Sequence, residues 1–374
     1  MSQLTNRLVK LQGEWRFYLS RNANGVELVA PLKRKRLLLS GLDSNAVLAV
    51  LWELSAGVPE DNLIGHLAQV SGLGSHSLQQ LLGKLNSYDA LLYTTEPIGL
   101  QDSGSQYDRQ IRYFEAFATN ERSAFAMNDN LQKRRVVIVG LGGYGTWLAM
   151  MAARMGIRHI IGIDFDHVEL SNLNRQVLFT QQDVGRPKTE ACAEAIAQID
   201  PNVRFEGHNA RINSPLDLIS YLEGADLVFN SFGYSPPDFP ANSVFQSISQ
   251  AALVANVPCL HLGGSWIGPL TVPGETPCIE CLFKNEKVAD IARASFPHID
   301  RPVPSIAPRM AITTGLAVWE AVRFLSKLDE PPSLRNLIIL DLHNYTRHAL
   351  LPIERSEECK LCGPIRKARR SEAP

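Results

Sequence analysis

The sequence predicts an α/β protein in which a doubly wound parallel sheet follows a smaller domain. From Gln132 onward, short runs of buried-type residues alternate with helical segments, as is typical of parallel strands covered on both faces. The apolar run RRVVIVG leads directly into the glycine-rich stretch GLGGYG, at residues 140–145. Residues 1–93 have a different pattern, a hairpin followed by helices. We therefore expect two domains of unequal size.

The composition limits the classes of partner. The chain has 374 residues, of which 45% are hydrophobic and 20% charged, and a formal net charge of -1. This charge provides no broad attraction to nucleic acid or to an anionic membrane. No stretch approaches the roughly eighteen apolar residues that a membrane span requires, and the N-terminus lacks the apolar core of a signal peptide. We expect a cytoplasmic protein that binds neither nucleic acid nor membrane.

Residues 1–93 are predicted to form a small winged-helix-like domain. Residues 14–19 alternate apolar and polar, and GVELVAPL repeats this alternation after the turn-prone RNANG, which predicts a hairpin. Three helical segments follow, in DSNAVLAVLWELSAG, PEDNLIGHLAQV and SHSLQQLLGKLNSYDALL. Residues 94–106 are rich in turn formers and are predicted to be a linker. Residues 107–374 form the second predicted domain.

The order of elements in the second domain follows from its alternating pattern. We expect strands at residues 134–140, 157–166, 202–212 and 225–232, with helices at 145–156 and 188–200. The weakly periodic segment from Lys284 to Arg301 is predicted to be a loop over the site.

The glycines of the first turn predict a nucleotide site. Gly140, Gly142 and Gly145, with Gly143 among them, match G-x-G-x-x-G. This pattern brings backbone N–H groups and a helix N-terminus to a phosphate. Asp164 ends the next predicted strand, where an acidic residue accepts hydrogen bonds from ribose. These features predict a Rossmann-like fold and fit NAD and ATP equally well.

Polar and cationic residues beyond Asp164 distinguish the two cofactors. They are Asp166, Asn172, Asn174 and Arg175 in DFDHVELSNLNRQ, and Lys188 at the start of the next helix. Hydride transfer needs no such cluster. Attack of a carboxylate on a phosphate does, because charge builds up on the phosphoryl oxygens and on the leaving pyrophosphate.

Six motifs in this order resemble the ubiquitin-activating-enzyme-like adenylyltransferases: RQIRYF, GLGGYGTWLA, DFDHVELSNLNRQ, VGRPKTEA, TPCIECL and ECKLCG. The resemblance covers residues 107–363. It implies a homodimer that uses ATP and Mg²⁺ to adenylate a carboxylate. It also implies that Asp164 binds ribose and that Asn172, Arg175 and Lys188 contact the phosphates. Arg109 would reach into the neighbouring subunit's ATP site.

The sequence departs from this family at two points. Relatives of the sulfur-carrier type place a magnesium-binding aspartate where this chain has Gly233, so that Asp238 is the candidate replacement. No cysteine lies between Cys281 and Cys359, which argues against thioester or persulfide chemistry. Cys192 and Cys259 lie on an apolar helix and an apolar strand and are predicted to be core residues.

Two Cys-x-x-Cys pairs predict a structural zinc site. Cys278 and Cys281 form the first pair, and Cys359 and Cys362 the second. Four thiolates make a closed tetrahedral Zn²⁺ site with no open position for catalysis. The fold must bring the pairs together, since they are far apart in the sequence.

The N-terminal domain resembles the clamp of peptide-modifying relatives, the branch of the microcin C and pantocin A maturation enzymes. This implies that a ribosomally made precursor peptide adds as a strand to the hairpin and is adenylated on a carboxylate. One alternative is activation of the C-terminus of a ubiquitin-like sulfur carrier. Another is a nucleotide-sensing DNA-binding regulator, suggested by the basic run at residues 33–36. That run is too short for strong phosphate affinity.

Overall fold

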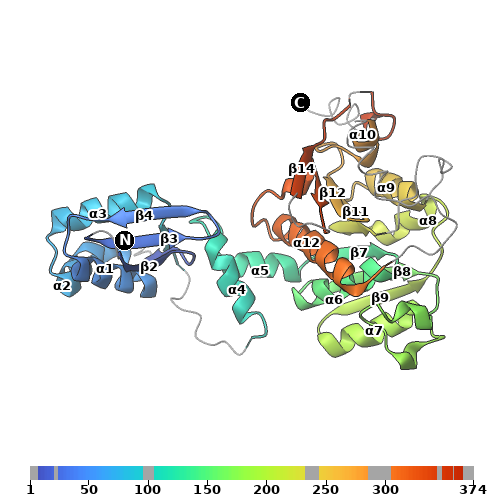
Figure 1. Ribbon diagram of the computed structural model, residues 1–374, viewed down its shortest axis with the longest axis horizontal. Helices are drawn as coiled ribbons and strands as arrows, with labels where there is room; N and C mark the ends of the chain where they lie inside the picture. The colour runs from blue at the N-terminus through green and yellow to red at the C-terminus, as the bar shows by residue number, and fades with distance from the viewer. Residues whose placement is uncertain are drawn as a thin grey trace, which may run out of the picture. The chain divides into compact units, whose positions relative to one another are not determined.

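A computed structural model describes residues 7–20, 24–95, 105–231, 244–284, 305–342, 348–356 and 358–364. It divides into two units, Met1–Asp129 and Asn130–Pro374 (Figure 1). Most of the predicted linker at residues 94–106, and nearly all of the loop predicted from Lys284 to Arg301, lie outside the described residues.

The first unit contains two antiparallel three-stranded sheets, in the orders β5-β1-β6 and β2-β3-β4. The predicted hairpin is confirmed, because β2 and β3 pair with Arg16 opposite Val29. The basic run leads into β4, where Arg36 forms an ion pair with the buried Glu27 of β3. The strands are β1 (Leu8–Leu11), β2 (Arg16–Leu19), β3 (Val26–Ala30), β4 (Lys35–Leu39), β5 (Val58–Pro59) and β6 (Leu91–Thr94).

The three helices predicted after the hairpin are present. Asp43 caps the first of them by accepting a hydrogen bond from the backbone N–H of Ala46, and Gly57 ends it at a φ of 91°. Apolar faces of these helices pack with both sheets into one core. The helices of this unit are α1 (Ser44–Ala56), η1 (Glu60–Asn62), α2 (Leu63–Ser71), α3 (Ser75–Ser87), α4 (Asp108–Phe114) and η2 (Glu115–Phe117); α5 (Ala124–Gln132) contains the division between the units.

An eight-stranded sheet organises the second unit, in the order β14-β13-β12-β11-β10-β7-β8-β9. The strands from β11 to β9 in this order are parallel. They are β7 (Arg135–Val139), β8 (His159–Asp164), β9 (Arg204–Asn209), β10 (Leu227–Asn230) and β11 (Cys259–Gly263). Three antiparallel strands extend it: β12 (Trp266–Thr271), β13 (Asn336–Leu340) and β14 (His348–Pro352).

The predicted parallel sheet is confirmed, and the three antiparallel strands that extend it were not predicted. Only Gly264 and Ser265 separate β11 from β12. Two residues can reverse a chain between antiparallel strands, whereas a parallel neighbour requires a long crossover. The strand and helix order predicted for residues 134–232 is confirmed, with helix α6 beginning at Gly143 rather than Gly145.

Helices cover both faces of this sheet. On one face, α6 packs against both α7 and α12. On the other, apolar side chains of β7, β8 and β10 pack with α8 and α9. The helices of the second unit are α6 (Gly143–Arg154), η3 (Leu170–Asn172), η4 (Gln181–Asp183), α7 (Lys188–Ile199), α8 (Leu216–Ile219), η5 (Ser220–Leu222), α9 (Val244–Val254), α10 (Ile279–Lys284), α12 (Ala307–Leu325) and η6 (Pro332–Leu334).

The helices that the structure describes include none with the combination of length and apolar character needed to cross a bilayer.

Candidate functional site

The glycine-rich loop turns tightly between β7 and α6. Gly140 has a φ of 90°, a conformation that favours glycine. A Cβ on Gly145 would lie 1.8 Å from the carbonyl oxygen of Gly140, so a larger residue there would displace the backbone. Gly142 caps α6, and the Thr146 hydroxyl donates to its carbonyl oxygen at 2.9 Å. The loop therefore places the N-terminus of α6 at the carboxyl edge of the sheet, where it can face an anion.

Asp164 braces this loop from the end of β8. Its carboxylate accepts hydrogen bonds from the backbone N–H of Leu141 at 2.6 Å and of Asp166 at 2.8 Å, and the residue is only 8% exposed. A carboxylate oxygen can accept more than one hydrogen bond. Asp164 can thus hold the loop and still accept from a ribose hydroxyl, which stays a prediction.

A cavity of about 250 Å³ opens beside Asp164 at the same edge. The guanidinium of Arg211 stacks on the ring of Phe165, 3.6 Å from its centroid, and both side chains line the cavity. The sequence interpretation missed both residues, although each directly follows the end of a strand or lies close to it, where ligands bind in such sheets. The lining residues are mostly apolar: Val139, Ile163, Asp164, Phe165, Ala210, Arg211, Ile212, Asn213 and Val244.

Lys188 and Asp166 meet next to this cavity. The Lys188 Nζ lies 3.1 Å from Asp166 Oδ2, and the Lys188 backbone N–H donates to the Asp166 carbonyl oxygen at 3.0 Å. The Lys188 side chain is 7% exposed, whereas that of Asp166 is 50% exposed. The structure thus brings together two residues that lie 22 positions apart in the sequence. The buried lysine pairs with the half-exposed carboxylate of Asp166.

The segment after β8 carries the other predicted polar residues. Asn172 is buried and its Oδ1 accepts from the backbone N–H of Glu169 at 3.2 Å, so it stabilises the short helix η3. Arg175 donates to the Ser171 carbonyl oxygen at 2.8 Å and to Asn174 Oδ1 at 3.0 Å. A Cβ built on Gly143 would lie 3.6 Å from Arg175 Cδ. Arg175 therefore lies beside the glycine-rich loop.

For two predicted site residues, the structure gives no position relative to this edge. Arg109 lies on α4 in the first unit, where its side chain is 93% exposed. Asp238, like Gly233, lies outside the described residues. The roles given to Arg109 and Asp238 remain predictions.

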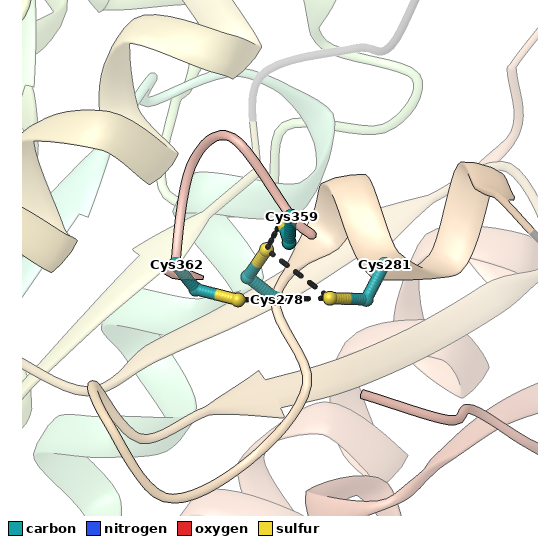
Figure 2. A group of neighbouring side chains, drawn as sticks. All are labelled: Cys278, Cys281, Cys359 and Cys362. Atoms are coloured by element: carbon teal, nitrogen blue, oxygen red, sulfur yellow. Dashed lines mark hydrogen bonds between the residues drawn. The ribbon is translucent and has the colours of Figure 1, made fainter. Parts of the chain in front are cut away.

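The four cysteines of the two Cys-x-x-Cys pairs meet in one buried cluster (Figure 2). Their sulfur atoms all lie within 4.8 Å of one another. Three Sγ–Sγ distances are 3.8 Å (Cys278 to Cys281), 3.6 Å (Cys278 to Cys359) and 3.6 Å (Cys281 to Cys362). Thiolates bound at about 2.3 Å to a tetrahedral Zn²⁺ lie about 3.8 Å apart. The cluster has the ligands and the spacing of a closed zinc site.

The cluster fastens the C-terminal segment to the extended part of the sheet. Cys281 lies on α10, and Cys278 just before this helix. The side chains of Trp266 and Phe245 pack in the same buried group as the cysteines. Cys192 and Cys259, the two cysteines outside the cluster, are core residues, as predicted. Both are buried, and burial raises the pKa of both thiols.

Comparison with curated proteins finds two informative relatives. The chain is 30% identical over 218 residues to ubiquitin-like modifier-activating enzyme 5 of Dictyostelium discoideum, a match that covers 55% of this chain and 56% of that protein. It is 28% identical over 233 residues to the sulfur carrier protein ThiS adenylyltransferase of Escherichia coli K12, covering 61% of this chain and 86% of the relative. The chain thus spans little more than half the length of the first relative.

Solved structures match both units. MccB of E. coli in complex with MccA-N7isoAsn superimposes with a TM-score of 0.75 at 22% identity, covering 95% of this chain and 99% of that one. Other E. coli MccB structures contain ATP or MccA. PaaA superimposes with a TM-score of 0.60 at 25% identity, covering 74% of this chain and 92% of its own. The small N-terminal β/α unit thus has a counterpart in the fold of MccB.

The family model described as the ThiF family matches residues 107–361, a range that contains the glycine-rich loop, the polar segment after β8 and three of the four clustered cysteines. The resemblance predicted from the six motifs is thereby confirmed. The chain belongs to the ThiF family.

Proposed function

We propose that this protein uses ATP and Mg²⁺ to adenylate a carboxylate of a ribosomally made precursor peptide. The observation that carries the proposal is the position of Lys188, Asp166 and Arg175 beside a glycine-rich loop at the carboxyl edge of the sheet. Cations fixed at this place stabilise the charge that develops when a phosphoryl group is transferred. A nicotinamide-dependent oxidoreductase would have no use for them.

The reaction assigns a task to each group. An oxygen of the acceptor carboxylate forms a bond to the α-phosphorus, and the bond from that phosphorus to the β-phosphate oxygen breaks, releasing pyrophosphate. Backbone N–H groups of the loop and the N-terminus of α6 bind phosphate oxygens. Lys188 and Arg175 exchange their present partners for phosphate oxygens as charge develops. An internal nucleophile of the peptide then displaces AMP.

The bound metal ions would differ in role. Mg²⁺ prefers oxygen ligands and neutralises the phosphates, and Asp166 offers a half-exposed carboxylate at the edge; Asp238 is the second proposed ligand. Zn²⁺ in the four-cysteine cluster would be structural, since four thiolates leave no position for substrate.

The N-terminal unit provides the reason to choose a peptide. In the described residues, β2 and β4 are the outer strands of their sheet, and Tyr18 and Leu19 on β2 are exposed. An extended peptide can add to such an edge through backbone hydrogen bonds. MccB, whose fold matches this unit as well, has been solved with MccA.

The test is isotope exchange between pyrophosphate and ATP in the presence of synthetic precursor-like peptides or of a small carrier protein ending in Gly-Gly. We expect exchange only with a peptide, and we expect deletion of residues 1–93 to raise the KM for peptide far more than that for ATP. Exchange with the carrier alone would support the alternative described next. Tight NADH binding without any exchange would refute adenylation.

Activation of a sulfur carrier is the second candidate. It is favoured by the similarity to the E. coli ThiS adenylyltransferase over 86% of that protein. The absence of a cysteine between Cys281 and Cys359 disfavours a thiol-transfer step. Activation of a sulfur carrier also gives the first unit no role. We therefore rank it below peptide modification.

We also propose a homodimer in which Arg109 acts in the partner's site. Mixing Arg109→Ala chains with Lys188→Ala chains should then restore exchange, because each heterodimer has one site with neither substitution. The mixture should be compared with each variant alone after heterodimers are shown to form. Equal inactivity of the mixture and the separate variants would contradict action in trans.

A further inference from the structure

The first turn of α12 lies against the phosphate side of the site. Asn174 Nδ2 donates to the carbonyl oxygen of Ser305, just before this helix, at 3.2 Å. Met310 is buried, and its sulfur lies 3.1 Å from the position of a Cβ built on Gly143. Residues 305–310 are thus held between the polar segment after β8 and the glycine-rich loop.

Arg309, within this turn, extends toward the junction of β11 and β12. Its guanidinium donates to Ser265 Oγ at 3.5 Å. The neighbouring Gly264 carbonyl oxygen accepts a hydrogen bond of 2.8 Å from the hydroxyl of Tyr144, the second residue of α6. Burial raises the pKa of Tyr144, and the positive charge of Arg309 opposes this rise. The guanidinium therefore lies near the loop, on the β11 side.

The charge of Arg309 has no protein anion to balance it within the described part of the chain. Its Nε is buried without a hydrogen-bond partner, and no acidic side chain in this part of the chain pairs with it. Arg323, on the same helix, pairs with both Glu320 and Asp329. A partly buried cation without a counter-charge is costly. Among the described residues, the Arg309 guanidinium therefore offers a free position for an anion.

The order of strands indicates which anion this is. Along the carboxyl edge, the cavity extends from the end of β7 across β8 to the segment after β9, the glycine-rich loop follows β7, and β10 separates β7 from β11. A nucleotide whose base filled the cavity would place its α-phosphate near the loop, where backbone N–H groups bind phosphate. The group that attacks this phosphate must come from beyond the nucleotide, which is the side of β11 and Arg309.

We propose that Arg309 binds the acceptor carboxylate and positions it for attack on the α-phosphorus. This inference rests on the proposed adenylation. A guanidinium can bind both carboxylate oxygens, and the contact with Ser265 Oγ places that of Arg309 at the turn between β11 and β12. Arg309 leaves the phosphates to Lys188 and Arg175.

Two stable probes separate the acceptor from the nucleotide. The first is 5′-O-sulfamoyladenosine, which lacks an acyl group. The second is its N-acetyl derivative, whose carbonyl oxygen stands for an oxygen of the activated carboxylate. Calorimetry on the full chain gives the affinity ratio of the two for wild type, Arg309→Gln and Arg309→Lys. Arg154→Gln is the matched control, because Arg154 is an exposed arginine at the far end of α6.

The wild type and Arg154→Gln should bind the acetyl compound more tightly than the parent. Arg309→Gln should lower that preference about tenfold, the effect of losing a charged hydrogen bond, with the affinity for the parent unchanged, and Arg309→Lys should retain part of it. An unchanged preference, or an equal loss for both probes in a folded Arg309→Gln protein, would overturn the proposal. If Arg309→Gln unfolds, Arg309→Lys decides by the same ratio. If the wild type binds neither probe, the proposed adenylation itself fails.

Discussion

The four-cysteine cluster and the carboxyl edge of the parallel sheet, where Lys188 and Arg175 lie, are both assembled from distant segments, but their polar groups have different kinds of partner. The cysteines are 1–3% exposed and lie among one another and apolar neighbours, with one polar side chain beside them, Glu280, whose Oε2 lies 3.9 Å from Cys359 Sγ. At the edge, Lys188 is paired with a half-exposed Asp166, and Arg175 with a backbone oxygen and Asn174. The cluster is suited to holding one metal ion permanently. At the edge, the present partners of Lys188 and Arg175 are polar groups that a substrate can replace.

This difference predicts that the cluster contributes to stability and the edge to the reaction rate. Losing a cysteine of the cluster should remove the zinc ion and weaken the fold. Losing a cation from the open edge should leave the fold intact and slow the reaction. The following predictions test this division, in order of decreasing effect.

Replacing Cys359 by serine should have the largest effect. We expect about one zinc per chain in the wild type and almost none in Cys359→Ser, with a large loss of thermal stability, because the binding free energy of a structural zinc contributes to folding. Elemental analysis and thermal unfolding measure both quantities. Cys192→Ala is the control, a buried cysteine outside the cluster, and it should keep its metal. Full metal content in Cys359→Ser would refute the zinc assignment.

Lys188→Ala should act on rate rather than on the fold. We expect pyrophosphate exchange to fall by about 10²- to 10³-fold, the effect of removing one transition-state charge contact, with a much smaller loss of ATP affinity. Arg186→Ala is the matched control, because that arginine pairs with Asp183 and Glu194. Equal losses of exchange in the two variants would mean that the position of Lys188 at the edge is irrelevant.

His261, in β11 between the two regions, should have the smallest effect. Burial lowers its pKa to about 3, below the usual value of about 6.5. Below pH 6.5 the unfolded chain therefore binds a proton that the folded chain does not, and the unfolding free energy falls by about 1.4 kcal/mol per pH unit down to about pH 3. Urea unfolding at pH 7 and 5.5 should show this slope reduced in His261→Gln. The same slope in both proteins would contradict it.

Local patterns predicted most of the nucleotide-binding half. The strands β7, β8 and β10 are buried apolar runs, and the helices α6 and α7 each have a buried apolar face. The glycine spacing fixes the turn between β7 and α6. The sequence also predicted that Asp166, beyond the end of β8, and Lys188, at the start of α7, lie at one edge, because ligands bind at the carboxyl ends of parallel strands. The structure brings the two residues together.

Non-local pairing could not be predicted in the same way. The strand β1 pairs with β5 and β6, which are far along the chain, and no periodicity in Leu8–Leu11 specifies those partners. The antiparallel strands β12 to β14 depend on the short reversal at Gly264 and Ser265. Arg309 belongs to no motif. What distinguishes it is that the described residues include no counter-charge for it, which only the packed structure reveals.

The cysteine cluster also has a consequence for the order of synthesis. Cys278 and Cys281 leave the ribosome well before Cys359 and Cys362, since the sequence is made from its N-terminus. Until the later pair emerges, a nascent chain presents two unpartnered thiols that can bind metal loosely or oxidise. The parallel strands from β7 to β11 can pair during this interval, because all their residues precede Cys278. The cluster can close only once translation has passed Cys362, which directly follows the range that the ThiF family model matches.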